Sequence, residues 1–278
     1  MSASPRSAAG ATNLLRGKRV LVTGVLTPKS IAFAIASACQ DAGAQVVLTS
    51  FGRAMSLTRR SAQRMAPAPE VLEMDATDVE QVRAVAGQVR DSWGGLDAVV
   101  HAIGFAPEDC LGGGFLDAPW ASVSTAFHVS SYSLRTLAAE FVPLMPETGG
   151  AIVSLTFDAS VAWPLYDWMG PAKAALESIT RYLARDLGHR HVRVNSLAAG
   201  PLETIAAKSI PGFDTLKTSW QEQAPLGWDS ADAAPVADAC VFLLSDLARG
   251  VTGEVLHVDG GFHSQGAPSA ALTAGARA

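Results

Sequence analysis

Cysteine is scarce in this 278-residue sequence, which contains only Cys39, Cys110 and Cys240. An odd number of widely separated cysteines excludes a disulfide framework and is typical of proteins in a reducing compartment. Long hydrophobic runs are also missing, because no stretch approaches the roughly 20 apolar residues that cross a membrane. These two absences favour a cytoplasmic protein without membrane-spanning segments.

The sequence also lacks an excess of basic residues. Its formal net charge is -5 and its pI is near 5.7, so it has no electrostatic attraction for nucleic acid or for an anionic membrane surface. His189 and His191 have no acidic or cysteine neighbour at metal-ligand spacing, so no metal site is expected. Nucleic acid, a membrane surface and a metal ion are therefore not expected as partners.

What is present is an alternation of short β-branched segments with longer helical patterns. This alternation predicts βαβ units and an α/β fold, a single doubly wound parallel sheet of Rossmann-like type. The expected strands begin at Arg19, Gln45, Glu70, Leu96, Ala151, His191 and Glu254. The expected helices cover about 30–42, 56–65, 79–93, 120–141, 166–188 and 232–244.

One catalytic domain is expected over residues 15–266. The segment 1–14 is small and polar without any period, which predicts a disordered or extended tail. The segment 267–278 has the same character and is expected to be a flexible tail.

The end of the first expected strand is a candidate phosphate site. Gly24 closes that strand, and a short loop with Ser30 leads into a helix, so backbone N–H groups and a helix N-terminus are available to a pyrophosphate. Gly24 is the only glycine of the loop, so the G-x-G-x-x-G fingerprint is absent. An ordinary strand-to-helix turn capped by Ser30 explains the segment equally well.

The ends of the next strands leave the choice of cofactor open. An acidic residue after the second strand would bind the 2′-hydroxyl of NAD, and a basic one the 2′-phosphate of NADP. Here Phe51 is followed by Arg53 and no acid. Asp75 follows the third strand in a position to meet an adenine, and Gly104 allows the backbone after the fourth strand to approach a flat ring.

A tyrosine and a lysine stand seven positions apart in "YDWMGPAK". If one helix runs from Tyr166 through Pro171, residues seven apart differ by roughly 20° in azimuth and share a face. A lysine ammonium close to the phenol would lower its pKa and make it a better acid or oxyanion stabiliser. For an arbitrary pair of this spacing, an aromatic at the edge of the core and a solvated Lys173 is the commoner explanation.

In combination these segments resemble the bacterial enoyl-[acyl-carrier-protein] reductases, a divergent branch of the short-chain dehydrogenase/reductase superfamily. The resemblance covers about Leu15 to Gly266 and includes "GVLTPKSIAFAIA", "HAIGFAP", "FLDAPW", "YDWMGPAKAALES", "AAGPLETIAAKSI" and "HVDGG". Other members of the superfamily use Tyr-x3-Lys, whereas the residue four before Lys173 is Met169. Tyr-x6-Lys is specific to the enoyl reductase branch.

The resemblance implies NADH-dependent reduction of the 2,3-trans double bond of an enoyl thioester, carried on acyl carrier protein or coenzyme A, in fatty-acid synthesis. NADP is the less favoured cofactor. Tyr166 would donate a hydrogen bond to the thioester carbonyl, Lys173 would hold the nicotinamide ribose, and Phe157 would lie beside the substrate. The implied cofactor residues are Gly24, Ser30, Ile31, Phe51, Asp75, Ala76, Ile103, Gly104, Lys173, Pro201 and Thr204. The implied substrate residues are Phe105, Leu111, Tyr166, Met169, Ala206 and Ile210.

The segment 203–228 resembles the substrate-binding loop of the family, although a pair of surface helices is the alternative. The resemblance also implies a homotetramer. Two positions depart from the family pattern: Glu203 replaces an arginine, and Ala102 replaces a serine. An anion near the pyrophosphate should weaken cofactor binding unless Glu203 turns outward or pairs with a neighbour such as Lys208.

These departures keep two other hypotheses open. One is a related enzyme of specialised metabolism that acts on a polyketide-like substrate. The other is a nucleotide-binding protein without turnover, although intact Tyr166 and Lys173 argue against it.

Overall fold

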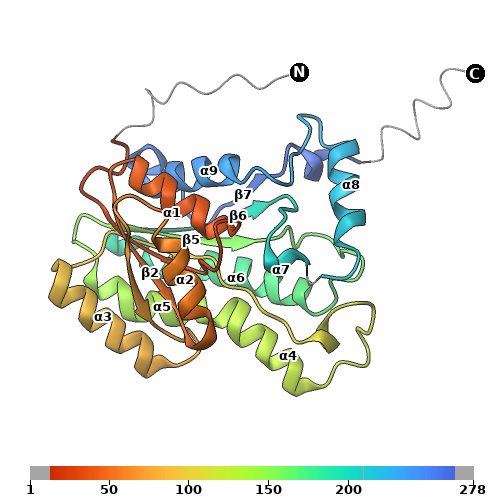
Figure 1. Ribbon diagram of the computed structural model, residues 1–278, viewed down its shortest axis with the longest axis horizontal. Coiled ribbons are helices and arrows are strands. Elements are labelled where there is room, and N and C mark those ends of the chain that lie inside the picture. Colours follow the sequence, from red (N-terminus) through yellow and green to blue (C-terminus); the bar gives the residue numbers. More distant parts are fainter. Residues whose placement is uncertain (1–12, 209, 267–278) are drawn as a thin grey trace, which may run out of the picture.

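The computed structural model describes residues 13–208 and 210–266 and consists of one parallel sheet between two layers of helices (Figure 1). The strand order is β3-β2-β1-β4-β5-β6-β7, and every neighbouring pair is parallel. The strands are β1 (Arg19–Thr23), β2 (Gln45–Ser50), β3 (Glu70–Glu73), β4 (Ala98–His101), β5 (Gly150–Thr156), β6 (Val192–Ala199) and β7 (Val255–Val258). The chain reverses its direction of winding between β1 and β4, where ligands bind in folds of this class.

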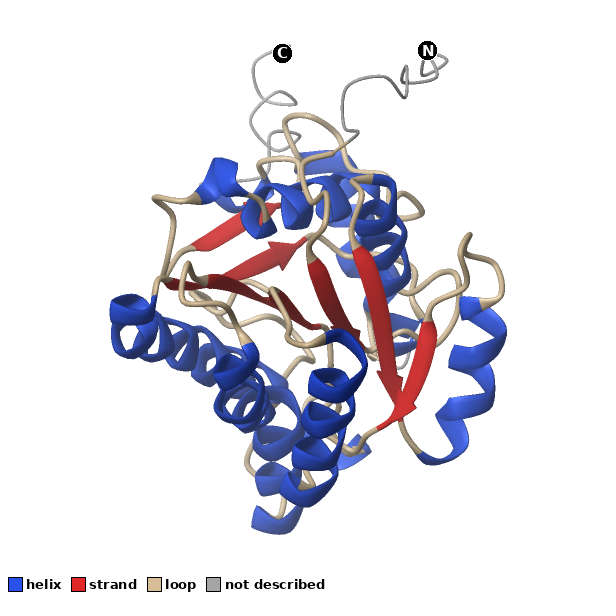
Figure 2. Ribbon diagram, turned by 90° about the vertical axis from the view of Figure 1, so that its left-hand side faces the viewer, coloured by secondary structure: helices blue, strands red, loops and turns tan. Residues whose placement is uncertain are grey.

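Helices cover both faces of the sheet, as Figure 2 shows. Helices α1 and α9 pack on one face, and α3, α5 and α6 on the other. The helices are α1 (Ile31–Asp41), α2 (Met55–Ala62), α3 (Val79–Trp93), α4 (Trp120–Phe127), α5 (Ser133–Phe141), α6 (Met169–Leu187), α7 (Ile205–Lys208), α8 (Phe213–Gln223) and α9 (Ala234–Leu244), with a short π-helix, η3 (His128–Tyr132), between α4 and α5.

The apolar strands explain this two-layered burial. In β1, Val20 and Val22 belong to the core on the α1 face, while Leu21 belongs to the core on the α3 face. All three are fully buried. Alternate side chains of a strand point to opposite faces, so a strand covered on both faces is apolar throughout.

The predicted sheet is confirmed, because all seven expected strands are present and parallel. The tails expected at 1–14 and 267–278 fall outside the described residues, apart from Asn13 and Leu14. The helix expected over 120–141 is interrupted by η3, and the one expected from Asp232 begins at Ala234.

The helix expected over 166–188 begins later than predicted. Helix α6 starts at Met169, so Tyr166 lies in the preceding turn and the prediction that it shares a helix face with Lys173 is wrong. Two residues of this turn have positive φ, 63° at Leu165 and 40° at Asp167, which no continuous α-helix allows. Pro171 is the third residue of α6, where its missing N–H costs no helical hydrogen bond.

Candidate active site

The ends of β1 and β4 approach each other closely at Gly24. Its φ is +82°, and a Cβ built there would lie 2.0 Å from the Ala102 carbonyl oxygen. The Thr23 hydroxyl fixes the approach, because it donates to the Val100 carbonyl at 3.0 Å and accepts from the Ala102 N–H at 3.0 Å. The backbone at this reversal of strand order is therefore bare, as a cradle for a dinucleotide requires.

Ser30 organises the loop after β1 instead of capping α1. Its hydroxyl oxygen accepts the N–H groups of Leu26 at 3.1 Å and Thr27 at 3.0 Å, and it makes no cap hydrogen bond. The first N–H groups of α1, which include that of Ile31, are left without a capping side chain at the position expected for the pyrophosphate.

The ends of β2 and β3 lie together, as their pairing requires. Phe51 is 52% exposed beside Gly52, whose N–H donates to the Glu73 carboxylate at 3.2 Å. Asp75 uses one carboxylate oxygen to accept from both the N–H and the hydroxyl of Thr77. An acidic group therefore lies where the ribose is expected. It comes from Glu73 at the end of β3, whereas the sequence analysis looked for it after β2.

Lys173 is buried at the end of β5. Its Nζ donates to the Leu155 carbonyl at 2.8 Å, and burial lowers its pKa to about 8, while the nearby Glu177 carboxylate opposes this shift. A Cβ built on Gly104 would lie 3.6 Å from this ammonium. Gly104 therefore lets the backbone after β4 approach this ammonium closely.

Tyr166 is also buried, at 6% exposure, and burial raises the pKa of its hydroxyl above the ordinary value of 10. The prediction that Lys173 lowers this pKa is therefore wrong for the unliganded protein, since desolvation dominates. A phenol that stays protonated is a hydrogen-bond donor and not a base. Its hydroxyl makes no hydrogen bond to any other described residue.

Aromatic rings from three segments form a wall beside Tyr166. The ring centroid of Phe157 lies 5.3 Å from that of Tyr166 and 5.0 Å from that of Trp163. Trp163 contacts Trp220 of α8 at 5.1 Å, and Trp220 stacks on Phe262 at 3.7 Å. We call Phe157, Trp163, Trp220 and Phe262 the aromatic wall. Of these four, the sequence analysis named only Phe157. Trp220 and Phe262 come from segments distant in sequence, whereas Trp163 lies in the same turn as Phe157 and Tyr166.

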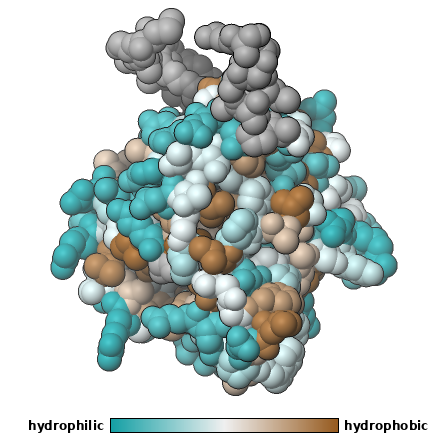
Figure 3. Space-filling view, turned by 90° about the vertical axis from the view of Figure 1, so that its right-hand side faces the viewer, coloured by the Kyte–Doolittle hydropathy of each residue, from teal (hydrophilic) through white to brown (hydrophobic). Residues whose placement is uncertain are grey.

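The expected substrate residues fall into two groups. Leu111, Met169 and Ile210 pack with Tyr166 in one apolar cluster. Phe105 is 53% exposed and Ala206 is also exposed, and neither belongs to that cluster. Figure 3 views the side of the molecule that carries α8, where apolar surface lies in patches among polar residues.

The segment after β6 holds the expected cofactor residues Pro201 and Thr204. The Pro201 carbonyl accepts the indole N–H of Trp228 at 2.8 Å, and the Thr204 hydroxyl accepts the Ala207 N–H at 3.0 Å, at the start of α7. Between them, Glu203 accepts from Lys217 of α8 at 2.9 Å. The neighbour that neutralises Glu203 is therefore chiefly Lys217, with Lys208 contributing less.

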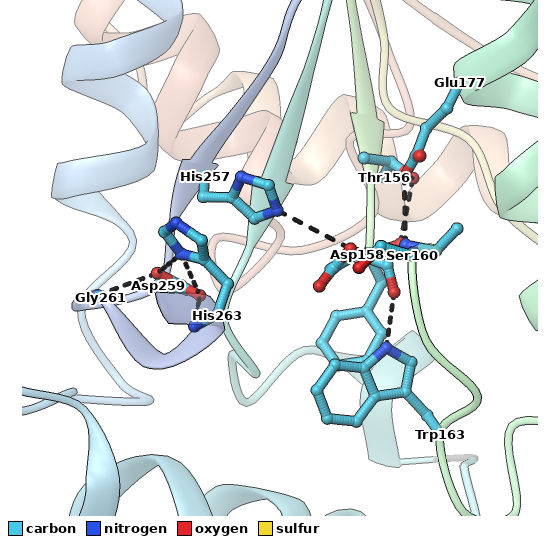
Figure 4. Close-up of polar contacts among 11 residues, drawn as sticks. Thr156, Asp158, Ser160, Trp163, Glu177, His257, Asp259, Gly261 and His263 are labelled. Carbon is cyan, nitrogen blue, oxygen red and sulfur yellow. Dashed lines mark hydrogen bonds and ion pairs between the residues drawn. The ribbon is translucent and has the colours of Figure 1, made fainter. Parts of the chain in front are cut away.

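A polar network ties the end of β5 to β7 (Figure 4). Asp158, directly after Phe157, accepts from the Ser160 N–H at 2.9 Å and lies 3.7 Å from His257 Nε2. The His257 ring stacks on His263 at 3.9 Å, and His263 Nδ1 lies 3.0 Å from Asp259. This network holds the turn that carries the aromatic wall against the edge strand.

A cavity of about 470 Å³ lies at the opposite edge of the sheet. Its lining includes Lys18, Asp97, Gly150 and Val192, which stand at the amino-terminal ends of β1, β4, β5 and β6. Parallel sheets of this type bind their ligands beyond the carboxyl ends of the strands, where Gly24, Lys173 and the other candidate residues lie. This cavity is therefore not the candidate active site.

Comparison with known proteins agrees with this placement. The family described as "Enoyl-(Acyl carrier protein) reductase" matches residues 24–263. This chain belongs to the enoyl reductase family. It is 42% identical to an enoyl-[acyl-carrier-protein] reductase [NADH] of Mycolicibacterium smegmatis, over 91% of this chain and 99% of that protein. An enoyl-[acyl-carrier-protein] reductase [NADH] of Mycobacterium avium is 40% identical over 91% of this chain and 98% of that protein. The enoyl-[acyl-carrier-protein] reductase [NADH] FabI of Aquifex aeolicus is 39% identical over 91% of this chain and 94% of that protein.

The sequence did not predict two features of this enoyl reductase, the first of which is the π-helix η3. In η3, the Ser130 hydroxyl accepts the Phe105 N–H at 2.9 Å and donates to the Phe105 carbonyl at 2.8 Å, while the Ser131 hydroxyl donates to the Ala172 carbonyl at 2.6 Å. The π-helix therefore clamps the loop after β4 to α6. No sequence signal marks a π-helix, although such bulges are frequent at functional sites.

The second feature is His101, at the end of β4. The Ser133 hydroxyl donates to the Val129 carbonyl, so His101 Nε2 must donate to Ser133, at 2.7 Å. Burial, with the nearby charge of Lys173, lowers the pKa of His101 to about 3. His101 is thus a neutral residue behind Lys173, and among the described residues its Nδ1 has no hydrogen-bond partner.

Proposed function

We propose that this chain is an NADH-dependent enoyl-thioester reductase of fatty-acid synthesis that reduces the 2,3-trans double bond of an enoyl group carried on acyl carrier protein or coenzyme A. One observation carries the proposal: a protonated, buried Tyr166 lies against the aromatic wall at Phe157, on the side of the sheet where Lys173 is buried at the end of β5. The relatives named as NADH-dependent enoyl-[acyl-carrier-protein] reductases support it.

The chain's own residues divide the work. When bound, NADH would supply a hydride to the β-carbon of the enoyl group and become NAD⁺, and a proton that comes ultimately from solvent would complete the reduction at the α-carbon. The Tyr166 hydroxyl donates a hydrogen bond to the thioester carbonyl oxygen, where negative charge grows as the enolate forms, and such a donor contributes about 3 kcal/mol in comparable sites. Lys173 holds the ribose hydroxyls with its ammonium. Phe157 and its neighbours in the aromatic wall exclude water from the enolate.

The residues present fit the cofactor. Gly24 lets the ends of β1 and β4 meet at the reversal of strand order, and the first turn of α1 offers N–H groups without a capping side chain. The Glu73 carboxylate at the expected ribose end repels a 2′-phosphate, which favours NADH over NADPH. Glu203, the departure that suggested a protein without turnover, is paired with Lys217 and its charge is compensated.

We also expect a homotetramer in the cytoplasm. Within the described part of the chain, no helix is both long enough and apolar enough to cross a membrane. The tetramer is inferred from membership of the enoyl reductase family.

The direct test is NADH oxidation, followed by absorbance, with purified protein and either crotonyl-CoA or trans-2-octenoyl-CoA. The wild type should consume NADH with at least one of these substrates. Replacing Tyr166 by Phe should lower kcat roughly 100-fold, because a single oxyanion donor is lost, while NADH affinity measured by fluorescence stays within about two-fold. Equal kcat in the two proteins would exclude Tyr166 as the donor.

A substrate of specialised metabolism is the second candidate, and the aromatic wall is the observation that favours it. Phe157, Trp163, Trp220 and Phe262 form a cluster of tilted rings with one stacked pair, and such a cluster suits an acyl group that carries an aromatic ring. Cinnamoyl-CoA, assayed beside the two linear thioesters, separates the candidates. A higher kcat/KM for cinnamoyl-CoA would favour the specialised substrate, and a higher value for trans-2-octenoyl-CoA would favour fatty-acid synthesis.

A further inference from the structure

One ion pair joins the cofactor side of the site to the substrate side. Lys217 of α8 donates to the Glu203 carboxylate at 2.9 Å, and the Ser230 hydroxyl donates to the same oxygen at 3.3 Å. The Glu203 N–H donates to the Ser230 carbonyl at 2.8 Å, which fixes the backbone of this residue. Three segments, after β6, within α8 and before α9, therefore meet at one carboxylate.

Each partner of the pair is next to a residue of the candidate site. Glu203 directly precedes Thr204, an expected cofactor residue, and follows Pro201 by two positions. Lys217 stands one helical turn before Trp220, which is buried in the aromatic wall. The Glu203–Lys217 contact thus links the backbone of residues 201–204 to α8, alongside the packing of Trp220 against the backbone at Gly200.

We propose that Glu203 is a positioning residue that couples the cofactor-binding segment to the substrate-binding helix α8, so that the enoyl thioester binds more tightly when NADH is bound. The proposal rests on the proposed function for its substrate. When NADH binds, it restricts the motion of residues 201–204. The Glu203–Lys217 pair then restricts the motion of α8, which keeps Trp220 in place beside the acyl group. The pair touches no reacting atom, so it acts on substrate binding and not on the chemical step.

The geometry makes this contact more than a surface ion pair. The Glu203 side chain is 33% exposed and the Lys217 side chain 26% exposed, and Ser230 is buried. A second carboxylate, Asp214, lies 4.0 Å from Lys217, but its side chain is 95% exposed. Asp214 therefore supplies a matched control, with the same charge near the same lysine and no link to the cofactor segment.

The first experiment measures steady-state kinetics with trans-2-octenoyl-CoA at saturating NADH. Glu203→Gln and Lys217→Met should each raise KM about five-fold, with kcat and the Kd for NADH within about two-fold of the wild type. The double variant should be no worse than either single variant, because both remove the same contact. Asp214→Asn should leave KM unchanged.

The second experiment exchanges the charges of Glu203 and Lys217. The variant that combines Glu203→Lys with Lys217→Glu should restore KM to within about two-fold of the wild type, because the pair is rebuilt with opposite polarity. Additive effects in the Gln/Met double variant, or a fall in kcat at unchanged KM, would overturn the positioning role. So would an unchanged KM in both single variants.

A third measurement does not depend on turnover. In hydrogen–deuterium exchange, NADH should slow the exchange of residues 213–223 in the wild type and much less in Glu203→Gln. If the wild type does not reduce any enoyl thioester, the proposed function fails while this exchange experiment still decides the coupling. NADH protection of α8 that is equal in the two proteins would refute it.

Discussion

At the scale of single residues, burial acts in opposite directions on the two members of the Tyr-x6-Lys pair. It raises the pKa of Tyr166 and lowers that of Lys173 to about 8, because an apolar environment disfavours the charged form of each. Both residues are therefore closer to their neutral forms than in water. For Tyr166 this preserves the proton that it donates, and for Lys173 it makes the charge sensitive to pH.

That sensitivity predicts a pH-dependent affinity for NADH. Below pH 8 the Lys173 ammonium is present in the free enzyme, and above this value it is progressively lost. The pyrophosphate of NADH is anionic, so binding favours the charged lysine and should take up a proton above pH 8. We expect the Kd for NADH to rise between pH 8 and pH 10 in the wild type.

The Lys173→Met variant is the control for this measurement, because it has no group to titrate at the same position. The Kd of this variant for NADH should be higher than that of the wild type at neutral pH. It should change little between pH 8 and pH 10. A wild-type Kd that does not change above pH 8 would mean that Lys173 keeps its proton, and the assigned effect of burial would be wrong.

At the scale of elements, the contact between the ends of β1 and β4 decides whether the cofactor cradle can form. Replacing Gly24 by Ala places a methyl group 2.0 Å from the Ala102 carbonyl oxygen at a φ of +82°. Overpacking and backbone strain together should lower the free energy of unfolding by about 3 kcal/mol or more and abolish NADH binding. Thermal or urea unfolding and NADH fluorescence measure the two effects.

Gly17 offers a matched control for this substitution. Its φ is +76°, close to that of Gly24, but a Cβ built there meets nothing within 4 Å. Gly17→Ala should therefore show the backbone strain alone, about 1 kcal/mol, with normal NADH binding. Equal losses of stability in the two variants would show that the approach of β4 to β1 is not the limiting contact.

The helices show how local irregularity positions the site. Helix α6 begins only at Met169, so Tyr166 lies in the turn before the helix and packs in the apolar cluster with Met169. The π-helix η3 brings Ser130 to the loop after β4 and Ser131 to α6. Both departures from a regular helix occur next to Tyr166 and Lys173, the proposed catalytic residues, and such irregularities are frequent at functional sites.

At the scale of the whole molecule, one helical face has the character of a subunit interface. Tyr132 and Tyr182 are 49% and 61% exposed, and each lies under an arginine, Arg135 and Arg185, at 5.7 Å and 5.1 Å. Exposed tyrosine and arginine side chains are enriched at protein interfaces. These residues belong to η3, α5 and α6, which lie on the same face of the sheet.

We expect the protein to be a homotetramer with four times the 28.8 kDa mass of the chain. Multi-angle light scattering on the wild type tests this. A Tyr132→Glu and Tyr182→Glu double variant should dissociate to smaller species if this face is the interface. A monomeric wild type would refute the tetramer, and a tetrameric variant would place the interface elsewhere.

Much of the fold was accessible from the sequence because its elements are local in origin. The seven strands follow from short β-branched segments, and α3 begins at a local signal, since Asp78 accepts from the N–H groups of Glu80 and Gln81. Local patterns did not reveal that Tyr166 precedes its helix, because the positive φ values of Leu165 and Asp167 arise from packing against the loop at Gly112.

The sequence by itself determined the sheet, its winding and the Tyr-x6-Lys pair, because periodicity and spacing are properties of neighbouring residues. Only the tertiary structure decided the partner of Glu203, the pKa direction of Tyr166 and the membership of the aromatic wall. Each of these depends on contacts between residues far apart in the chain, as Trp163, Trp220 and Phe262 illustrate. Burial and pairing are properties of such contacts, and spacing along one chain does not encode them.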